Sequence, residues 1–568
     1  MAELDLVVRG GRVVDGTGAP PTTADVAVRD GRIVEVGRVA GSARRVVEAD
    51  GALVTPGFVD IHTHYDGQAT WDSQLAPSSW HGVTTVVMGN CGVGFAPCRP
   101  EDRQRLIELM EGVEDIPGTA LHEGLPWTWV SFAEYLDHLA GRSYDIDVAA
   151  QVPHGAVRLY VMGERGARRE AASPEEIAAM GEIVREAVAA GALGFTTSRT
   201  RNHRTSRGEP TPTLTAAEEE LVGIATAMGE AGGVMEVVSD FTPDLETEFA
   251  SLRHMVESSG RPLSISVAAE DHRAYWGSLR DHIAKAASDG LPMKGQVAAR
   301  AIGLILGLQA TLNPFLGLAS YQAVAGLPLD ERVRRLRDPE VKARLLAEAD
   351  DATAAGDRGR MVFGRFDKMF ELTDPPDYEP SPEQSVAARA EREGRSPAAV
   401  VYDLLLRDEG RAFLYFPLFN WIDGSLDAVG RMLRDENLLP GLGDGGAHVG
   451  TICDASFPTT LLSYWGRDRR ERLPVEWIIR RQCRDTAAAV GLHDRGVIEP
   501  GRRADLNVID FEGLRLHAPT MAFDLPAGGK RLLQRADGYL HTFVAGEETY
   551  ASGEATGTLP GRLVRGAR

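Results

Sequence analysis

Two histidines one residue apart follow a short, mostly apolar run near the start of the chain. The run 58–61 leads into His62 and His64 without a turn residue. In a β-strand, residues two apart point to the same side, so both imidazoles aim at one point. Neutral imidazole nitrogens bind zinc, iron or nickel. The pattern predicts a pair of metal ligands, and the alternative is a pair of strand histidines held by hydrogen bonds.

A cysteine follows the next apolar run. Residues 83–88, VTTVVM, end in Gly89-Asn90-Cys91-Gly92, which places a thiol at the end of the next predicted strand. A lone cysteine is usually a small buried hydrophobic residue. Two histidines and a thiol at neighbouring strand ends are, however, a typical donor set for a metal. The sequence therefore favours a metal site here over a purely structural cysteine.

The segments GFVDIHTHYD at 57–66 and GNCGVGFAP at 89–97 together resemble the amidohydrolase superfamily, and within it the branch of D-aminoacylases (N-acyl-D-amino-acid deacylases). The resemblance extends over nearly the whole chain. It implies a metal-dependent hydrolase built on a barrel. A divalent metal lowers the pKa of a bound water and polarises a carbonyl, which is the chemistry that amide hydrolysis needs.

An aspartate beside glycines ends the last predicted strand, in LGDGGAH at 442–448. Turn chemistry alone could explain an aspartate there. In the superfamily, an aspartate at this place contacts the metal and moves the proton from water to the leaving group, and by this resemblance Asp444 inherits both roles. His448 is expected either to orient the substrate or to pack.

The resemblance fails at two metal ligands. The D-aminoacylase branch carries histidines at the ends of its fifth and sixth strands, whereas this chain reads GGVMEVVSDF and PLSISVAAED there. Val238 and Val267 stand at the matching places and cannot bind a metal. The resemblance then implies one divalent metal ion, expected to be zinc, held by His62, His64 and Asp444 with Cys91 as a further ligand.

Other polar residues are expected near the pocket. By the same resemblance, His154 follows the third strand and could donate to a developing oxyanion or only anchor its loop. Arg199, Arg201 and His203 follow the fourth strand, where they could bind a substrate carboxylate or pair with the protein's own acids. Glu236, on the fifth strand, could replace a missing metal ligand, but it is expected rather to contact the substrate or to support the ligands.

Alternating strand and helix patterns fill the middle of the chain and predict an α/β fold, a (β/α)8 TIM-like barrel at 57–496. Residues 174–190 predict a helix, with Ser173 as N-cap and a proline at its first position. The barrel strands are predicted at 58–62, 84–88, 146–152, 194–197, 234–238, 263–267, 413–418 and the approach to Gly443. Residues 327–411 read as a helical insertion over the barrel mouth.

Both ends of the chain consist of short β-type runs. Residues 1–56 alternate valine-rich runs with Gly10-Gly11 and Asp30-Gly31, which are hairpin signals, and residues 497–568 repeat this style. We expect one small composite β-sandwich built from both termini, as in the superfamily. Two unrelated small β units are the alternative.

Composition limits the partners. The 568 residues include 61 Lys+Arg and 82 Asp+Glu, for a formal charge of -21, which argues against nucleic acid or an anionic membrane surface as a partner. Four scattered cysteines do not form a disulfide framework, and the first residues lack the pattern of a secretory signal. We expect a cytoplasmic enzyme with a small-molecule substrate, and a homo-oligomer remains open.

The leading hypothesis is hydrolysis of an amide bond in an N-acyl-amino-acid-like or cyclic amide substrate. The same site acting on an ester, a lactone or a carbon-carbon bond is one alternative. A non-catalytic barrel that serves as an assembly or binding module is another, motivated by the two missing histidines. The joint presence of HxH, GNCG and GDGGAH speaks against the module.

Overall fold

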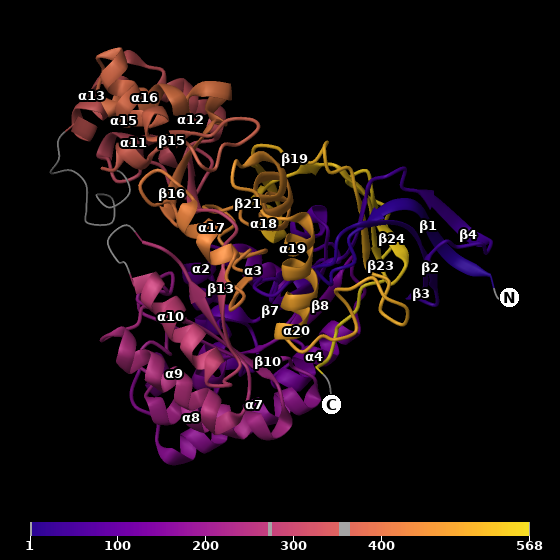
Figure 1. Ribbon diagram of the computed structural model, residues 1–568. Coiled ribbons are helices and arrows are strands. Elements are labelled where there is room, and N and C mark those ends of the chain that lie inside the picture. The colour runs from indigo at the N-terminus through magenta and orange to yellow at the C-terminus, as the bar shows by residue number, and fades with distance from the viewer. Residues whose placement is uncertain (1–2, 271–274, 351–363, 567–568) are drawn as a thin grey trace.

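The computed structural model describes residues 3–270, 275–350 and 364–566. Figure 1 shows an α/β barrel in the centre, a β domain formed by the indigo and yellow ends of the chain on one side, and a mostly helical orange unit at the other. The fold class is therefore the predicted one, a barrel with an additional β domain.

Parallel strands form the barrel in two sheets. The first contains β6 (Phe58–Asp60), β7 (Val83–Met88) and β8 (Asp147–Ala150), and the second contains β9 (Val152–Pro153), β10 (Gly194–Arg199), β11 (Val234–Ser239), β12 (Leu263–Val267), β13 (Met293–Val297) and β17 (Leu438–Pro440). Only Gln151 separates β8 from β9. The other seam is closed by backbone hydrogen bonds, from Asp444 N to His62 O at 3.0 Å and from His64 N to Gly445 O at 2.7 Å. The closing backbone thus carries three predicted site residues.

One predicted barrel strand was wrong. The aromatic run at 413–418 forms β16 (Phe413–Phe419), which pairs antiparallel with β14 (Ile302–Gly307) and β15 (Phe370–Glu371) outside the barrel. The seventh barrel strand is instead β13, which lies in parallel between β12 and β17. High β-propensity identifies a strand but does not identify its sheet.

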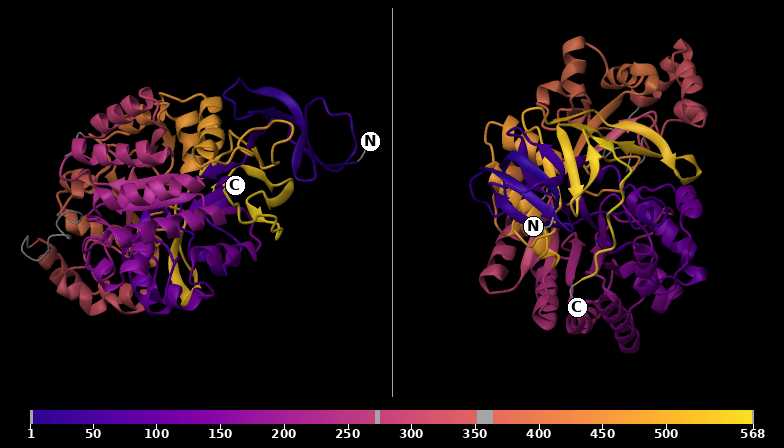
Figure 2. Two further views of the ribbon diagram at one scale, coloured as in Figure 1. Left: turned by 90° about the horizontal axis from the view of Figure 1, so that it is seen from below. Right: turned by 90° about the vertical axis from the view of Figure 1, so that its right-hand side faces the viewer.

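Helices α7 (Pro174–Ala190), α8 (Glu218–Ala231), α9 (Leu245–Ser259) and α10 (Tyr275–Ser288) lie side by side on the outside of the barrel (Figures 1 and 2). The predicted start of α7 is confirmed. Ser173 Oγ accepts a hydrogen bond from Glu176 N, while the Glu176 carboxylate accepts one from Ser173 N. This reciprocal capping satisfies two backbone donors that the first helical turn leaves free.

The two ends of the chain share a nine-stranded sheet. Strand β5 (Leu53–Pro56) pairs antiparallel with β18 (Leu506–Ile509), which joins the N-terminal strands to the C-terminal ones. The predicted Asp30-Gly31 turn connects β2 (Thr22–Arg29) to β3 (Arg32–Gly37). The sheet order is β25-β24-β23-β18-β5-β1-β2-β3, with β4 beside β1, and the strands not yet placed are β1 (Leu4–Val13), β4 (Ala43–Glu48), β23 (Tyr539–Val544), β24 (Glu547–Ala551) and β25 (Glu554–Ala555).

The predicted turn at Gly10-Gly11 was wrong. Strand β1 runs through it, and its register with β2 shifts between Val8 and Gly11. Gly10 has a φ of 64°, a conformation that glycine adopts without steric penalty. The glycine pair therefore forms a bulge inside a strand rather than a hairpin.

A second hydrophobic core lies in the unit outside the barrel. It joins Leu306, Tyr321, Val401 and Phe416, from the β14–β16 sheet and from helices that include α11 (Ala319–Ala325), α12 (Leu329–Leu336), α13 (Pro339–Asp350), α15 (Val386–Glu393) and α16 (Pro397–Leu405). The elements that share this core extend beyond 327–411 in both directions. The proposed domain limits at 56/57 and 496/497 stay predictions.

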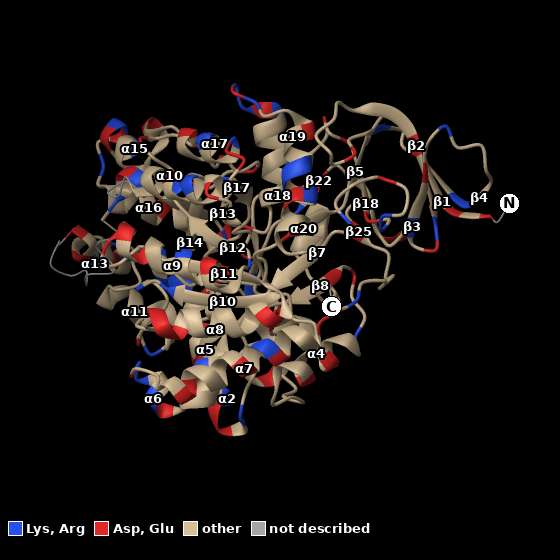
Figure 3. Cartoon of the chain, turned by 60° about the horizontal axis from the view of Figure 1, so that its bottom comes forward, with Lys and Arg blue, Asp and Glu red and all other residues tan. Residues whose placement is uncertain are grey.

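No helix in the described part of the chain has both the length and the apolar character needed to cross a membrane. Figure 3 shows acidic and basic residues interspersed over the outer helices of the barrel.

Candidate metal centre

Three potential ligands converge at the carboxyl ends of the first two barrel strands. His62 and His64 follow β6, Cys91 follows β7, and all three side chains are buried. Each offers one donor atom, and these atoms lie within 4.8 Å of one another. The imidazole centroids are 5.5 Å apart. The structure thus brings these three residues together, as the strand period predicts.

Asp444 reaches the same cluster from the loop after the last strand. Its Oδ1 lies 3.5 Å from His62 Nε2 and 3.8 Å from His64 Nε2. His62 Nε2 lies 3.3 Å from Cys91 Sγ. Ligands of a tetrahedral zinc ion, with bonds of about 2.0–2.3 Å, are separated by roughly 3.3–3.8 Å. The spacing of these donor atoms therefore suits a single divalent cation.

Gln296, on β13, orients His62. Gln296 Oε1 lies 2.9 Å from His62 Nδ1, and Gln296 Nε2 donates to Ser264 Oγ at 2.8 Å. The amide oxygen thus faces the imidazole, Nδ1 carries the proton, and Nε2 directs its lone pair at Cys91 and Asp444. Sequence reasoning missed Gln296 because it missed β13. The sequence did contain a signal for this strand, because Gln296 is a polar residue in an alternating pattern with the apolar residues Met293 and Val297.

Glu114 is a second residue that sequence reasoning missed. It is the last residue of α2 (Arg103–Glu114) and is only 1% exposed. Its Oε1 lies 3.5 Å from His64 Nδ1. Within the described residues, neither of its carboxylate oxygens has a hydrogen-bond partner. Glu114 continues the buried helical face of Leu106 and Met110, and an acid at this spacing was the available signal.

Glu236 supports the loop that carries Cys91. Its Oε2 accepts a hydrogen bond from Cys91 N at 3.1 Å, and its Oε1 lies 3.5 Å from Ser266 Oγ. Glu236 is 1% exposed. The carboxylate thus holds the loop that carries Cys91, and the expected contact of Glu236 with the substrate stays a prediction.

Unusual backbone conformations gather at this site. Cys91, Asp444 and His448 have φ values of 54°, 46° and 49°. Positive φ is uncommon for residues other than glycine, and such residues cluster at functional sites where the surrounding structure holds them. Three residues with this unusual backbone conformation around one cluster indicate that the surrounding structure holds the cluster in place as a functional site.

Burial dominates the electrostatics of the acids. It raises the pKa of Asp60 and of Asp66 to about 7, and that of Glu236 to about 8. Burial, with neighbouring acids adding to it, also raises the pKa values of Asp444 and Glu114 well above their usual range. Several carboxyl groups thus lie in one buried region and repel one another when ionised. A cation would stabilise their ionised forms.

The other donors show the complementary effect. Burial lowers the pKa of His62 to about 4 and that of His64 well below its usual range, so both imidazoles are neutral. Burial and nearby acids raise the pKa of Cys91. His64 Nδ1 and Asp444 Oδ1 have no hydrogen-bond partner in the described part of the chain. Neutral imidazoles beside unpartnered carboxylate oxygens fit a divalent metal ion.

His154 does not serve as an oxyanion donor, which corrects its expected role. Its Nδ1 lies 2.8 Å from Thr197 Oγ1 and its Nε2 lies 2.9 Å from Glu220 Oε1. Arg158 Nε also donates to Glu220 Oε1, at 2.9 Å. Both ring nitrogens are used inside the protein, so no ring donor remains for a substrate.

Replacing His154 with alanine is expected to lower the free energy of unfolding by about 1–3 kcal/mol, because Glu220 loses a buried partner. The thermal midpoint of unfolding should fall while the metal content stays the same. His254→Ala is the matched surface control, since His254 is half exposed where it pairs with Glu218. Unchanged stability together with a large loss of kcat would return His154 to the reaction.

The three residues predicted to bind substrate after β10 have different surroundings in the structure. Arg199 Nε and Nη2 donate to the two carboxylate oxygens of Glu248 at 2.5 and 3.1 Å, which corrects its expected contact with a substrate carboxylate. The Arg201 side chain is exposed. Of the three predicted residues, His203 is the one that lies near the centre, and its Nδ1 is 2.9 Å from Ser198 Oγ. Burial, with His448 and His62 nearby, lowers its pKa to about 3.

His448 borders the cluster on a more open side. Its side chain is 24% exposed, and its Nε2 lies 3.5 Å from Glu114 Oε2. A cavity of about 250 Å³ lies among residues close to these two in the sequence, and it is lined by Glu111, Asp115, Ile116, Pro117, Thr311, Gly450 and Lys530. Asp115 and Gly450 on its wall directly follow the end of α2 and the segment with His448.

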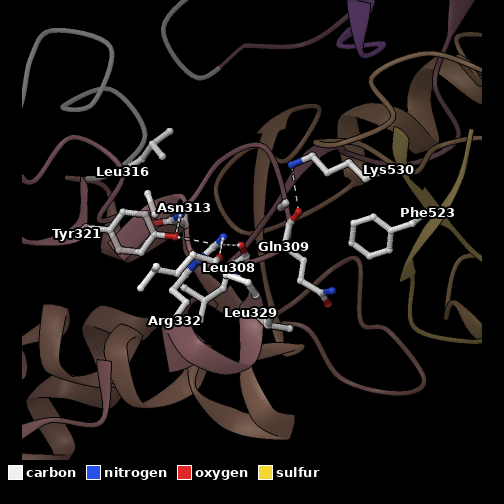
Figure 4. A pocket seen from close by; sticks show the side chains of 13 residues that line it. Leu308, Gln309, Asn313, Leu316, Tyr321, Leu329, Arg332, Phe523 and Lys530 are labelled. Atoms are coloured by element: carbon white, nitrogen blue, oxygen red, sulfur yellow. Dashed lines mark hydrogen bonds between the residues drawn. The ribbon is translucent and has the colours of Figure 1, made fainter. Parts of the chain in front are cut away.

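A separate cavity of about 390 Å³ lies between the outer helical unit and the hairpin of β20 (Thr520–Leu525) and β21 (Gly529–Leu533). Figure 4 shows Tyr321 and Arg332 on one side of it and Phe523 and Lys530 on the other. None of the predicted site residues lines this cavity. The metal centre is therefore distinct from it.

Fold and site together define a barrel protein with a polar centre at its strand ends. The chain belongs to the amidohydrolase family, whose sequence model matches residues 45–550. This membership confirms the predicted class, an amidohydrolase-type hydrolase.

Similar proteins support the predicted branch. A D-aminoacylase of Alcaligenes xylosoxydans xylosoxydans is 26% identical over 573 residues, which cover 99% of this chain and 97% of the relative. A solved D-aminoacylase structure has a TM-score of 0.66 at 24% identity, with 99% of this chain and 100% of that chain covered. An N-acyl-D-glutamate deacylase from Bordetella bronchiseptica, solved with zinc and a phosphonate inhibitor, has a TM-score of 0.65 at 23% identity and the same coverage. These structures share the fold.

Proposed function

We propose that this chain hydrolyses an amide bond of a small molecule, an N-acyl amino acid or a cyclic amide, with one divalent metal ion, zinc. The observation that carries the proposal is the convergence of His62, His64, Cys91 and Asp444 at the strand ends. The D-aminoacylase and N-acyl-D-glutamate deacylase similarities support the substrate class.

One metal is proposed, although a similar D-aminoacylase structure is described with a binuclear metal center. Strands β11 and β12 read VMEVVS and LSISV, so neither supplies an imidazole. Glu236 on β11 is engaged by Cys91 N. The remaining nitrogen, sulfur and oxygen donors suit zinc.

When bound, the cation lowers the pKa of water and polarises the amide carbonyl. The chain's own residues then perform the proton transfers. Asp444 accepts a proton from the attacking water through its carboxylate and donates it to the nitrogen as the carbon-nitrogen bond breaks. An N-acyl amino acid gives a carboxylic acid and an amine, and a cyclic amide opens to one molecule that carries both groups. We propose that the substrate enters past His448, beside the cavity of about 250 Å³.

The test combines elemental analysis with a substrate panel. Protein purified without chelator should hold about one zinc ion per chain and hydrolyse members of a panel of N-acyl amino acids of both hands and cyclic imides. Chelation should abolish turnover, and added zinc should restore it. Activity confined to esters or lactones would favour the alternative reaction. Metal below stoichiometric amounts with no turnover would favour the non-catalytic module.

A further inference from the structure

The end of helix α2 places a buried acid behind one of the metal-binding histidines. Glu114 closes the helix, and Asp115 follows with a φ of 51°. Leu106, Met110 and Val113 bury the same helix in the main core. The side chain of Glu114 is therefore held in place by the packing of its helix and does not depend on a bound ion.

The neighbouring residue fixes the helix end from the other side. Asp115 Oδ1 accepts a hydrogen bond from Thr311 Oγ1 at 3.2 Å, and Asp115 Oδ2 accepts one from Gly450 N at 3.2 Å. The backbone N–H of His448 donates to the Glu114 carbonyl. The end of α2 and the loop after the last barrel strand are thus fastened to each other.

Within this frame, the Glu114 carboxylate lies between two imidazoles. Its Oε1 lies 3.5 Å from His64 Nδ1, and its Oε2 lies 3.5 Å from His448 Nε2. The opposite nitrogen of His64, Nε2, faces Asp444 Oδ1. Glu114 therefore lies on the side of His64 that faces away from the proposed metal. A carboxylate at that place fixes the tautomer and ring orientation of a metal-binding histidine and raises its basicity.

The contact also explains why an acid is buried here. An ionised carboxylate removed from water without partners is strongly destabilising, and both oxygens of Glu114 lack a hydrogen-bond partner within the described residues. Two imidazole N–H groups at its two oxygens would supply the missing partners. We expect the distances of 3.5 Å to shorten to hydrogen bonds when a metal ion binds, as the contacts of active sites commonly do.

We propose that Glu114 is a positioning residue. One oxygen holds His64 with its proton on Nδ1, so that Nε2 is free to bind the metal, and the other oxygen holds His448 at the entrance. This proposal rests on the metal centre of the proposed function. It makes the two histidines unequal, because His62 is oriented by the neutral amide of Gln296 whereas His64 is oriented by a carboxylate.

The test is the metal affinity of Glu114→Gln, which keeps the shape and one acceptor but removes the charge. Metal-free protein is titrated with Co²⁺ and with Zn²⁺ against a competing chelator. Affinity should fall about 10–100-fold, the visible absorption of the Co²⁺-loaded protein should shift, and excess metal should restore part of the lost kcat. Glu111→Gln is the matched control. It lies one turn earlier on α2, where Glu111 accepts from Gly118 N, and it should bind metal as the native protein does.

Glu114→Asp is the second variant if the glutamine variant does not fold. It keeps the charge on a shorter side chain and should give an intermediate affinity. Native affinity and an unchanged Co²⁺ spectrum in Glu114→Gln, or in Glu114→Asp where only that variant folds, would overturn the positioning role while the metal centre stands. Failure of the native protein to bind either ion would overturn the proposed function and this role together.

Discussion

Asp444→Asn is expected to lower kcat by about 10²–10⁴-fold, the range for loss of a general acid-base group, while the metal content stays largely intact. Asparagine has the same shape and keeps an oxygen at Oδ1, but it cannot accept the proton. The backbone at this position is fixed independently of the side chain, because Asp444 N donates to His62 O at 3.0 Å across the barrel seam. The loss of rate should therefore reflect the lost proton transfer.

Asp435→Asn is the matched control for this prediction. Asp435 lies just before β17, at the opposite end of the strand that leads to Asp444, and its Oδ1 accepts from Asn437 N at 2.9 Å. The control has the same change of charge and should keep the native kcat. The measurements are steady-state kinetics and elemental analysis on both variants. An Asp444→Asn enzyme with native turnover would remove Asp444 from the proton transfer.

The centre of the site could be predicted because its residues obey strand geometry. His62 and His64 share a face through the period of two, and Cys91 and Asp444 follow strands whose carboxyl ends meet at one edge of a parallel barrel. These relations hold for any barrel of this type. Strand spacing was therefore sufficient to predict that His62, His64 and Cys91 converge, whereas the place of Asp444 at the same point was predicted from the resemblance to the amidohydrolase superfamily.

The supporting residues could not be predicted in the same way. Gln296 lies on a strand with few apolar residues, and the count of eight strands was completed with the aromatic run of β16 instead. Glu114 ends a helix, and the packing of that helix on the barrel depends on tertiary contacts that local sequence does not specify. Sequence patterns identify the type of an element more reliably than its partner.

Ion pairing within the protein was the other reason why part of the site could not be predicted from the sequence. Arg199 is neutralised by Glu248, and His154 is held by Glu220, 66 residues away in the sequence. Both residues had the chemistry that a substrate site needs. Whether a buried charged or polar group faces a substrate or its own protein depends on long-range contacts that periodicity does not encode.

Removal of the metal is expected to lower stability by an amount that grows as pH rises. In the metal-free fold, burial raises the pKa of Asp60 and of Asp66 to about 7 and that of Glu236 to about 8. Groups with raised pKa values contribute stability that is complete below their unfolded values near 4 and is lost as pH rises through 7 to 8. The buried histidines act in the opposite direction below about pH 6.5, because their lowered pKa values keep them neutral in the fold. The thermal midpoint of the metal-free protein should therefore fall between about pH 6.5 and pH 8, where only the acids titrate.

Metal affinity, in contrast to the stability of the metal-free protein, should increase as pH rises. The cation favours ionised acids and a deprotonated Cys91, so its binding displaces protons. For each proton displaced, affinity rises about tenfold per pH unit. A free metal concentration of about 1,000 times Kd contributes about 4 kcal/mol. Thermal midpoints with and without zinc should therefore separate progressively from pH 5.5 to pH 8.

The double variant His62→Asn/His64→Asn should show the fall with pH but no separation. A separation that is constant or shrinks as pH rises would mean that zinc displaces no proton from these groups, and the native site would then not be the one described by His62, His64 and Cys91.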